Sequence, residues 1–548
     1  MAEYDVAARL PATSRLALWA GRLLLPLTAV GVATWIESAR FALRAPSLID
    51  EWFALAYSGR AAHALFHGQY LAAGSDFAGR YRPGMSAIWN YAQWHLLGPA
   101  SLGVADAWGI LRTAAFFVAV WLLAKSLFGR PLRASSALLL LAPLAVVSTP
   151  PIAVALARFG PGEPLMVAGI VIGLTVIARG ARQFQTTSSP RARGLAVLAI
   201  ALGYLAYLLG VYSKESSLAL LAGLPFFVKW LAPQLRAEAA RGWMARARLA
   251  GCGALLIAPP LHVGVHLGLA AIRGTSPWPN ADLSFGLKIY ATLSPLLGVP
   301  GVLGTWAWFL AVPVAIGVTV FEARRRNRVA WLLAGVLVTG YLMSAIPLAR
   351  GPMPTWYYVP WVAAVAAVAF RGLAYASGRA RLAVVALAVV LIPLSTPAAL
   401  AEWKGTEQSG ATAVSLSKGV VAAGCPLYLA NFDIEQRVAL PLLFRFGDTA
   451  KIPSCSPSSE QAYAVSWKNK PLSAGFAKGC AGGWRHVAAV DDIGLYRCSS
   501  LRTLHLLDQY SASGEPTVTV VRVQLPVRHP PPAQIFQPLP TLQPSVIR

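Results

Sequence analysis

Residues Arg324–Leu348 read RRRNRVAWLLAGVLVTGYLMSAIPL, in which a cluster of arginines stands directly before twenty residues without a charge. A helix rises about 1.5 Å per residue, so the apolar part is long enough to cross the roughly 30 Å hydrocarbon core of a bilayer. Basic residues beside such a helix are typical of its cytoplasmic end. The stretch therefore predicts a membrane-spanning helix that begins on the cytoplasmic side.

Apolar runs of this kind recur along the chain. Two shorter runs follow breaks that contain polar residues, and both are needed to keep basic connections on one side. We therefore expect an all-α polytopic membrane protein of about eleven transmembrane helices. The first run is read as a retained span, since it is too long for a signal peptide and has no clear cleavage site. The long runs are Leu16–Ile36, Ala107–Phe128, Ala134–Ala155, Leu195–Val211, Ala250–Ala271, Gly301–Phe321, Val329–Leu348, Tyr357–Tyr375 and Leu382–Leu400, and the short ones are Pro164–Ile177 and Ser216–Leu231.

The charge of the chain supports a membrane protein and predicts its sidedness. Charged residues make up 13% of the sequence, against roughly 25% in soluble domains, and the net charge is +25. This charge argues against nucleic-acid binding, because the arginines cluster in alternate connections and no nucleic-acid motif accompanies them. The positive-inside rule makes these connections and the N-terminus cytoplasmic and the C-terminus extracytoplasmic. The basic connections are Arg130/Arg133, Arg179–Arg193, Arg236–Arg248, Arg324–Arg328 and Arg379/Arg381.

The cysteines agree with this sidedness. Cys252 lies within a predicted span, where a buried free thiol is ordinary, and the other four follow the last span. Four cysteines in one polar region suit two disulfides in an oxidising compartment, and their spacing is not that of a zinc site. Three connectivities are possible, and we favour Cys425–Cys455 with Cys480–Cys498.

The predicted spans divide the chain into three parts. Residues 1–401 form the transmembrane domain, which includes a long first extracytoplasmic loop over 37–106 with interfacial helices rich in Trp and Tyr. Residues 402–525 are expected to form a small α/β or mostly β domain, with strand-like alternation at Pro426–Leu429 and Val487–Tyr496. Residues 526–548 are rich in Pro and Gln, which predicts an extended or disordered tail.

The first outer loop holds the densest set of polar residues. Asp50 and Glu51 are adjacent just after the first span, and either carboxylate could act as a general base toward an acceptor hydroxyl. The alternative is that both acids only cap the following helix, where the helix dipole favours negative charge. Arg80 and Arg82 follow later in the same loop.

The order of short motifs in this loop resembles the start of the GT-C fold glycosyltransferases that use polyprenyl-phosphate sugars, such as the protein O-mannosyltransferases and lipid A aminoarabinose transferases. In that superfamily an acidic residue of the first outer loop is the catalytic base, and a basic or Pro-containing stretch lies near the lipid phosphate. The resemblance thus implies that Asp50 or Glu51 is the base. The common K-P-P reads Arg82-Pro83-Gly84 here. The motifs are D-E-W at 50–52, G-x-Y at 68–70, R-Y-R-P-G at 80–84, L-L-G at 96–98 and R-T at 112–113.

Further polar residues stand at the outer edges of later spans. Charged side chains at membrane depth tend to face a bundle interior or a wet cavity, where they could hold the carrier phosphate. The alternative is snorkelling to the interface, which needs no ligand. Lys214-Glu215 and the later Arg350 with Tyr357-Tyr358 resemble turns of the same superfamily. The candidates for substrate or phosphate binding are Arg80, Arg82, Arg158, Glu163, Lys214, Glu215, Arg350, Tyr357 and Tyr358.

Two H-x-x-x-H pairs, His63/His67 and His262/His266, fall toward the predicted outer side. With Asp50 or Glu51 they could bind a divalent metal, and otherwise they are interfacial imidazoles that bond to backbone or water. We place the metal site at His63 and His67. The chain has no Gly-rich phosphate loop and no G-x-S-x-G motif, so no other cofactor is expected.

The leading hypothesis is a membrane glycosyltransferase that moves a sugar from a polyprenyl-phosphate carrier to a hydroxyl of a lipid, polysaccharide or protein acceptor on the extracytoplasmic face. A transporter or flippase of a lipid-linked or polar solute and a non-catalytic envelope assembly protein are the alternatives. The Ala/Arg/Leu-rich composition and outer disulfides favour a bacterial inner membrane.

Overall fold

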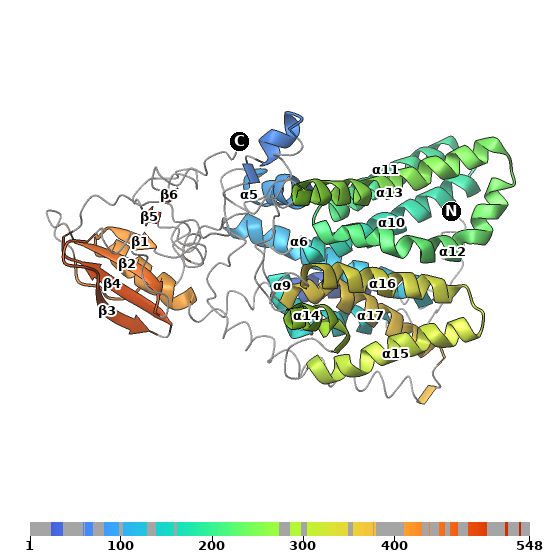
Figure 1. The fold of residues 1–548 in the computed structure, drawn as a ribbon. Coiled ribbons are helices and arrows are strands. Elements are labelled where there is room, and N and C mark those ends of the chain that lie inside the picture. Colours follow the sequence, from blue (N-terminus) through green and yellow to red (C-terminus); the bar gives the residue numbers. More distant parts are fainter. Residues whose placement is uncertain are drawn as a thin grey trace, which may run out of the picture.

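The structure is a computed structural model, shown in Figure 1. The residues that it describes are 23–36, 58–59, 61–69, 82–97, 102–128, 139–157, 162–272, 285–297, 304–348, 355–375, 378–379, 410–429, 438, 449–454, 461–468, 480–490, 492–500, 521–523 and 536–538.

Six helices in the described part of the chain are long and apolar enough to cross a membrane. Shorter apolar helices cover Leu23–Ile36 and α17 (Val359–Arg371), and α15 (Gly304–Arg324) coincides with another predicted span. The protein is thus a multi-pass membrane protein, as its apolar runs predict. The six are α6 (Leu102–Phe128), α10 (Glu163–Thr186), α11 (Pro190–Val211), η2 with α12 (Glu215–Ala219 and Leu220–Ala239), α13 (Trp243–Ile272) and α16 (Val329–Leu348).

The two short apolar runs belong to full-length helices. The run at Pro164–Ile177 continues through charged residues to the end of α10, and the run at Ser216–Leu231 continues to the end of α12. An apolar run ends at the first cluster of charge, whereas a helix continues past the membrane boundary, where long side chains reach water. The run at Leu382–Leu400 lies outside the described residues.

One predicted span is broken in the structure. Instead of one helix over Ala134–Ala155, the described residues form α8 (Leu141–Val147) and α9 (Pro150–Ala157). The hydroxyls of Ser148 and Thr149 both donate to the carbonyl of Ala145, at 3.0 Å each. Pro150 and Pro151 follow and have no N–H to continue the helix ladder. Competition from the hydroxyls and the missing donors together explain the break.

The helices α10 and α11 pack so closely that glycines are required between them. A Cβ added at Gly169 would lie 2.6 Å from the Cα of Gly210, and one at Gly173 would lie 2.6 Å from the backbone N of Tyr207. Real Cβ atoms do not approach backbone this closely, so any larger residue would push the two helices apart. Small residues at such crossings are typical of membrane helix pairs.

A second end of the bundle also contains a buried ion pair. It lies opposite to the end at which α10 begins. The Arg371 Nε at the end of α17 donates to Glu322 of α15 at 2.6 Å, and its Nη1 donates to the carbonyls of Leu127 and Phe128. Tyr375 also donates to Glu322. Buried charges are stable only when paired and hydrogen-bonded, and here both conditions hold. The cluster joins α6, α15 and α17.

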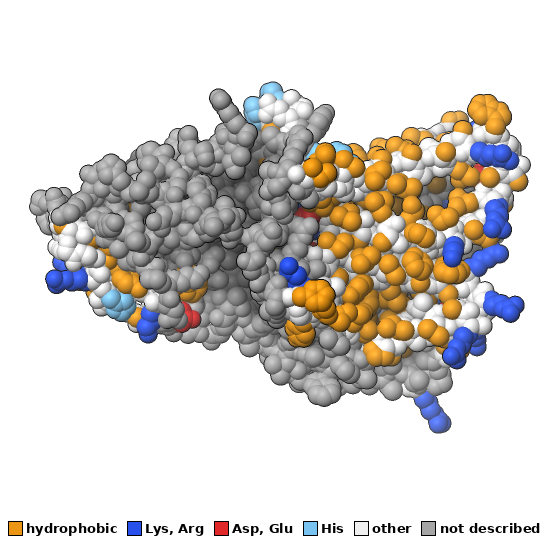
Figure 2. All heavy atoms as spheres, viewed as in Figure 1, with side chains coloured by type: hydrophobic (Ala, Val, Ile, Leu, Met, Phe, Trp, Pro, Cys, Tyr) orange, Lys and Arg blue, Asp and Glu red, His pale blue; other side chains and the backbone are white. Residues whose placement is uncertain are grey.

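Three of the basic connections lie at one end of the bundle. The links α10–α11, α12–α13 and α15–α16 turn at the right-hand end of the helices in Figure 1. Figure 2 shows Lys and Arg side chains gathered at this end, beside a broad hydrophobic face. The separation of charge from apolar surface is the pattern expected for helices in a bilayer.

Shorter elements connect the long helices. These are the π-helix η1 (Gly84–Trp89), α5 (Asn90–His95), α14 (Phe285–Leu297), and the 3-10 helices η3 (Thr355–Tyr358) and η4 (Gly372–Ala374). Trp94 of α5 and Ala105 of α6 belong to the same buried cluster as Leu427, Val465 and Leu495 of the C-terminal sheet.

The C-terminal region forms a mixed six-stranded sheet with the order β3-β4-β2-β1-β5-β6. Strands β1 and β2 are parallel and the other neighbours are antiparallel. A helix over 410–422 precedes β1, so the domain is of the α/β kind expected. The strands are β1 (Leu427–Leu429), β2 (Ala462–Trp467), β3 (Arg485–Val490), β4 (Ile493–Cys498), β5 (Val521–Val523) and β6 (Phe536–Pro538).

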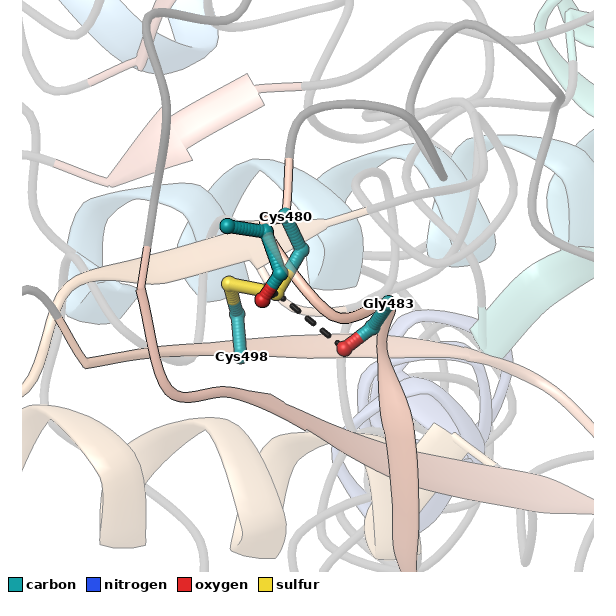
Figure 3. The surroundings of a disulfide bond; sticks show 4 residues. Cys480, Gly483 and Cys498 are labelled. Atoms are coloured by element: carbon teal, nitrogen blue, oxygen red, sulfur yellow. Dashed lines mark hydrogen bonds between the residues drawn. A yellow bond between two sulfur atoms is a disulfide. The ribbon is translucent and has the colours of Figure 1, made fainter.

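A disulfide joins Cys480 to Cys498 at the end of β4, as Figure 3 shows. This is one of the two pairings favoured from the sequence. Cys425 is also disulfide-bonded, and Cys455 lies outside the described residues. Cys252 is free within α13, but its side chain is exposed on the helix surface and not buried as expected.

Three residues of the Pro-rich tail are described by the structure. Residues Phe536–Pro538 form strand β6 and pair with β5, within the segment expected to be extended or disordered. Pro538 is tolerated because β6 is the edge strand of the sheet, where a missing N–H leaves no ladder bond unmade.

Candidate functional site

The centre of the candidate site is the turn between α11 and α12. Helix α11 ends at Val211, Lys214 has extended backbone angles (φ −153°, ψ 135°), and η2 begins at Glu215. Lys214 and Glu215 are 2% and 4% exposed, and Ser213 is fully buried. The turn lies at the end of the bundle away from the basic connections, because α11 begins at those connections and ends here.

Two glycines on neighbouring segments hold this turn in place. The N–H of Gly84 donates to the carbonyl of Tyr212 at 2.9 Å, and a Cβ at Gly84 would lie 2.7 Å from the carbonyl oxygen of Leu209. A Cβ at Gly162 would lie 2.6 Å from the carbonyl oxygen of Ser213. The backbone of the turn can approach these two segments closely only because each has a glycine at the contact. The two contacts therefore fix the position of the backbone directly before Lys214.

Lys214 forms a buried ion pair with Glu163, the first residue of α10. The Lys214 Nζ lies 2.8 Å from the Glu163 Oε1, and both side chains are almost completely buried. The positive end of the α10 dipole favours a carboxylate at this position. The Oε1 atom of Glu163 is engaged by the ammonium, whereas Oε2 has no hydrogen-bond partner among the described residues. The carboxylate thus retains acceptor capacity toward a ligand.

Tyr357 completes the surroundings of Lys214. The Lys214 Nζ lies 3.5 Å from the Tyr357 hydroxyl and 4.5 Å from the centre of its ring. A cation over an aromatic face is stabilised by the ring quadrupole, the more so when it is shielded from water. The ammonium is therefore held by a carboxylate and by an aromatic ring.

The neighbouring residue Glu215 pairs with Arg82. The Arg82 Nε and Nη2 donate to the two carboxylate oxygens of Glu215 at 2.6 and 3.0 Å, in a buried bidentate contact. Arg82 stands directly before Pro83 and η1, so this pair ties the first outer loop to the turn after α11. Bidentate pairs of this kind fix orientation as well as charge.

A cavity of about 260 Å³ lies against these ion pairs. Its wall contains Lys214 and Glu215, and the rest is largely apolar and comes from η2, α13 and α16. The two ion pairs contribute two cations and two anions, so together they carry no net charge. The lining residues are Lys214, Glu215, Ser216, Leu218, Leu267, Gly268, Ile346 and Pro347.

The structure brings together five of the residues predicted for substrate or phosphate binding: Arg82, Glu163, Lys214, Glu215 and Tyr357. Tyr358 has a different surrounding, because its hydroxyl hydrogen-bonds to Ser294 of α14 at 2.7 Å. A role for Tyr358 in substrate binding stays a prediction. The candidates Asp50, Glu51, Arg80, Arg158 and Arg350 lie outside the described residues.

The two histidines of the first loop are stacked on each other. The rings of His63 and His67 stack face to face with centroids 4.0 Å apart, and the Nδ1 of His67 bonds to the carbonyl of His63 at 2.8 Å. Among the described residues no three His, Cys, Asp or Glu side chains are grouped as metal ligands.

The residues that sequence reasoning missed are the glycines and the apolar wall of the cavity. Gly162 and Gly84 each stand beside a proline, in G-P-G and R-P-G, which is a signal for a turn. It does not reveal the backbone that each glycine faces. Pro347, near the end of α16, is a comparable signal.

Comparisons with known proteins give structural matches only. No family model matches the chain, and no curated protein matches it. ArnT from Cupriavidus metallidurans in the apo state is similar with a TM-score of 0.47 and 14% identity, over 86% of this chain and 97% of that chain. ArnT from the same organism bound to undecaprenyl phosphate is similar with a TM-score of 0.48 and 13% identity, over 87% of this chain and 98% of that chain.

Proposed function

We propose that the protein is an integral membrane glycosyltransferase that moves a sugar from a polyprenyl-phosphate carrier to an acceptor hydroxyl. The observation that carries the proposal is the pairing of two buried cations, Lys214 and Arg82, with two buried carboxylates beside one cavity. Charged groups at membrane depth are costly and are kept where a substrate needs them. A lipid-linked phosphate needs cations at a point that its apolar chain can reach from the bilayer.

The reaction requires positive charge at the leaving group. The acceptor oxygen forms a bond to the anomeric carbon of the sugar while the bond from that carbon to the phosphate oxygen breaks. The phosphate leaves as an anion, which Lys214 and Arg82 stabilise as its charge develops. Asp50 or Glu51 takes the proton of the acceptor hydroxyl. Glu163, with acceptor capacity to spare, receives a hydrogen bond from a hydroxyl of the bound substrate.

The same proposal includes the wider arrangement of the chain. Residues 1–401 form a GT-C-like transmembrane domain of about eleven spans, and residues 402–525 form an extracytoplasmic domain. The N-terminus and the basic connections lie in the cytoplasm, so the site opens on the extracytoplasmic face of a bacterial inner membrane. The acceptor is a lipid, polysaccharide or protein reached from that face.

Binding of undecaprenyl phosphate to the purified full-length protein tests the proposal. Lys214→Met removes the cation and keeps much of the side-chain volume, so affinity should fall at least about tenfold. Lys229→Met is the matched control, because Lys229 lies on α12 over the ring of Trp331 and away from the cavity. Equal affinity in Lys214→Met and the control contradicts the proposal.

A further inference from the structure

Helix α13 contains two adjacent prolines just past its middle. In an α-helix each backbone N–H donates to the carbonyl four residues earlier, and proline has no N–H. Pro259 and Pro260 therefore leave the carbonyls of Leu255 and Leu256 without their helix donors. A carbonyl without a donor is unfavourable inside a bilayer, because no water is there to bond to it.

Two tyrosines of α11 supply the missing donors. The Tyr204 hydroxyl donates to the carbonyl of Leu255 at 3.1 Å, and the Tyr207 hydroxyl donates to the carbonyl of Leu256 at 2.5 Å. The tyrosines stand three residues apart, which places them side by side on one face of α11. Each carbonyl that a proline frees is thus bonded by one hydroxyl, and α11 is joined to α13 where the α13 ladder is interrupted.

Beyond the prolines α13 packs loosely. Residues 261–272, which lie away from the basic connections, are called here the distal part of α13. Among its side chains that the structure describes, Val263 alone is buried. A Cβ added at Gly264 or Gly268 would have no neighbour within 4 Å, in contrast to the close glycine contacts between α10 and α11. A segment with few buried contacts beyond an interrupted ladder can move separately from the rest of its helix.

The distal part also forms one wall of the cavity beside the ion pairs. Leu267 and Gly268 line that cavity, and both lie beyond Pro260. Lys214 lies on the same cavity and belongs to a different segment, the turn after α11. The position of the distal part relative to this turn therefore determines the width of the cavity.

We propose that Tyr204 and Tyr207 are positioning residues that hold the distal part of α13 in place and thereby set the width of the cavity. Pro259 and Pro260 are the hinge. While both hydroxyls bond to the freed carbonyls, the distal part stays against α11, and when these bonds are lost it moves about the prolines. The inference goes beyond sugar transfer, since it holds for any ligand of the cavity.

The distance between two spin labels measures the position of the distal part in full-length protein in detergent micelles. One label is attached at Leu269→Cys in the distal part and the other at Ile316→Cys on α15, since both side chains are exposed. Cys252 is free and exposed, so this pair is made in a Cys252→Ser background. Tyr204→Phe/Tyr207→Phe keeps both rings and removes both hydroxyls, so the mean distance should shift by about 2 Å.

Two controls separate this movement from a general loosening of the bundle. A label on the native Cys252, paired with Ile316→Cys, reports the part of α13 before the prolines, and its distance should stay unchanged in the tyrosine variant. Tyr341→Phe is the matched loss of a hydroxyl, because Tyr341 donates to the carbonyl of Thr292 at 3.0 Å and not to α13. It should leave both distances unchanged.

The decisive comparison restores the missing donors. Pro259→Ala/Pro260→Ala returns two N–H groups to the helix ladder, so the tyrosine hydroxyls become dispensable. In this background Tyr204→Phe/Tyr207→Phe should leave the distal distance unchanged. The proposal is overturned if the tyrosine variant leaves this distance unchanged when the prolines are present, or if it shifts the distance equally in both backgrounds.

Undecaprenyl-phosphate affinity of the same variants connects the hinge to the proposed function. Affinity should fall in Tyr204→Phe/Tyr207→Phe and return in the Pro259→Ala/Pro260→Ala background. A shifted distance with unchanged affinity would support the hinge and count against that ligand for the cavity.

Discussion

The ammonium of Lys214 lies 2.8 Å from the carboxylate of Glu163, and both side chains are almost completely buried at the ends of α11 and α10 that lie away from the basic connections. An isolated charge at this depth would be strongly unfavourable, so each charge compensates for the burial of the other. An anionic ligand can take the place of Glu163 beside Lys214. The pair is therefore a structural contact, and under the proposed function its cation would bind the carrier phosphate.

The first prediction concerns this coupling. Removing one partner leaves a buried charge without compensation, so Glu163→Gln and Lys214→Met should each lower stability by about 3–5 kcal/mol. The double variant should lose much less than the sum of the two. Thermal unfolding in detergent micelles, evaluated as a double-mutant cycle, measures the coupling. Additive losses would contradict it.

The second prediction concerns the bidentate contact of Arg82. Arg82→Lys keeps the charge but loses the planar pair of donors to Glu215, so undecaprenyl-phosphate affinity should fall about tenfold, or about 1.4 kcal/mol. Arg241→Lys is the control, since Arg241 pairs with Glu238 at the basic end and its side chain is 71% exposed. If both variants bind like the parent protein, Arg82 does not position the phosphate.

The third prediction concerns Gly162. The methyl group of Gly162→Ala would meet the carbonyl of Ser213 at 2.6 Å, which forces the turn that carries Lys214 to move. Displacement of a positioned group by about 1 Å lowers a transfer rate by about a hundredfold. Gly253→Ala in α13 has no neighbour within 4 Å and should have no effect. Initial rates of sugar transfer in membranes compare the two, and similar rates would remove the role assigned to Gly162.

The fourth prediction concerns the sheet domain. Loss of the disulfide in Cys498→Ser should lower the stability of the domain by about 3 kcal/mol and expose the Cys480 thiol. Maleimide labelling without reductant should modify Cys480 in this variant and leave it unmodified in the parent protein. Cys252→Ser should not change the labelling of Cys480. Labelling of Cys480 in the unreduced parent protein would show that the bond does not form.

The membrane helices could be predicted from the sequence because hydrocarbon selects for long apolar runs, as at Val329–Leu348. The helix bounds could not, since α10 and α12 continue beyond their apolar runs. The break between α8 and α9 was missed, although Thr149-Pro150-Pro151 contains its cause. A hydropathy pattern takes no account of hydroxyls that bond to backbone carbonyls, or of prolines that lack an N–H donor.

The sequence was sufficient to select candidate residues for the site, but not to predict the contacts between them. Lys214 and Glu215 were selected because charge at a membrane edge is unusual, and Arg82 because its motif resembles that of the superfamily. Which cation pairs with which carboxylate depends on how distant segments meet, and Arg82 with Glu215 joins two regions far apart in the chain. Tyr357 and Tyr358 are adjacent, yet the Tyr357 hydroxyl lies near Lys214 whereas the Tyr358 hydroxyl bonds to Ser294.

The most direct test of the central claim is mass analysis of glycolipids and glycans from a deletion strain that carries the parent gene or single variants. The parent gene and Lys229→Met should restore a glycosylated species, whereas Lys214→Met should not. At least one of Asp50→Asn and Glu51→Gln should also fail, with normal membrane insertion. An unchanged glycan and glycolipid profile between the deletion strain and the parent strain would contradict the assignment of a glycosyltransferase.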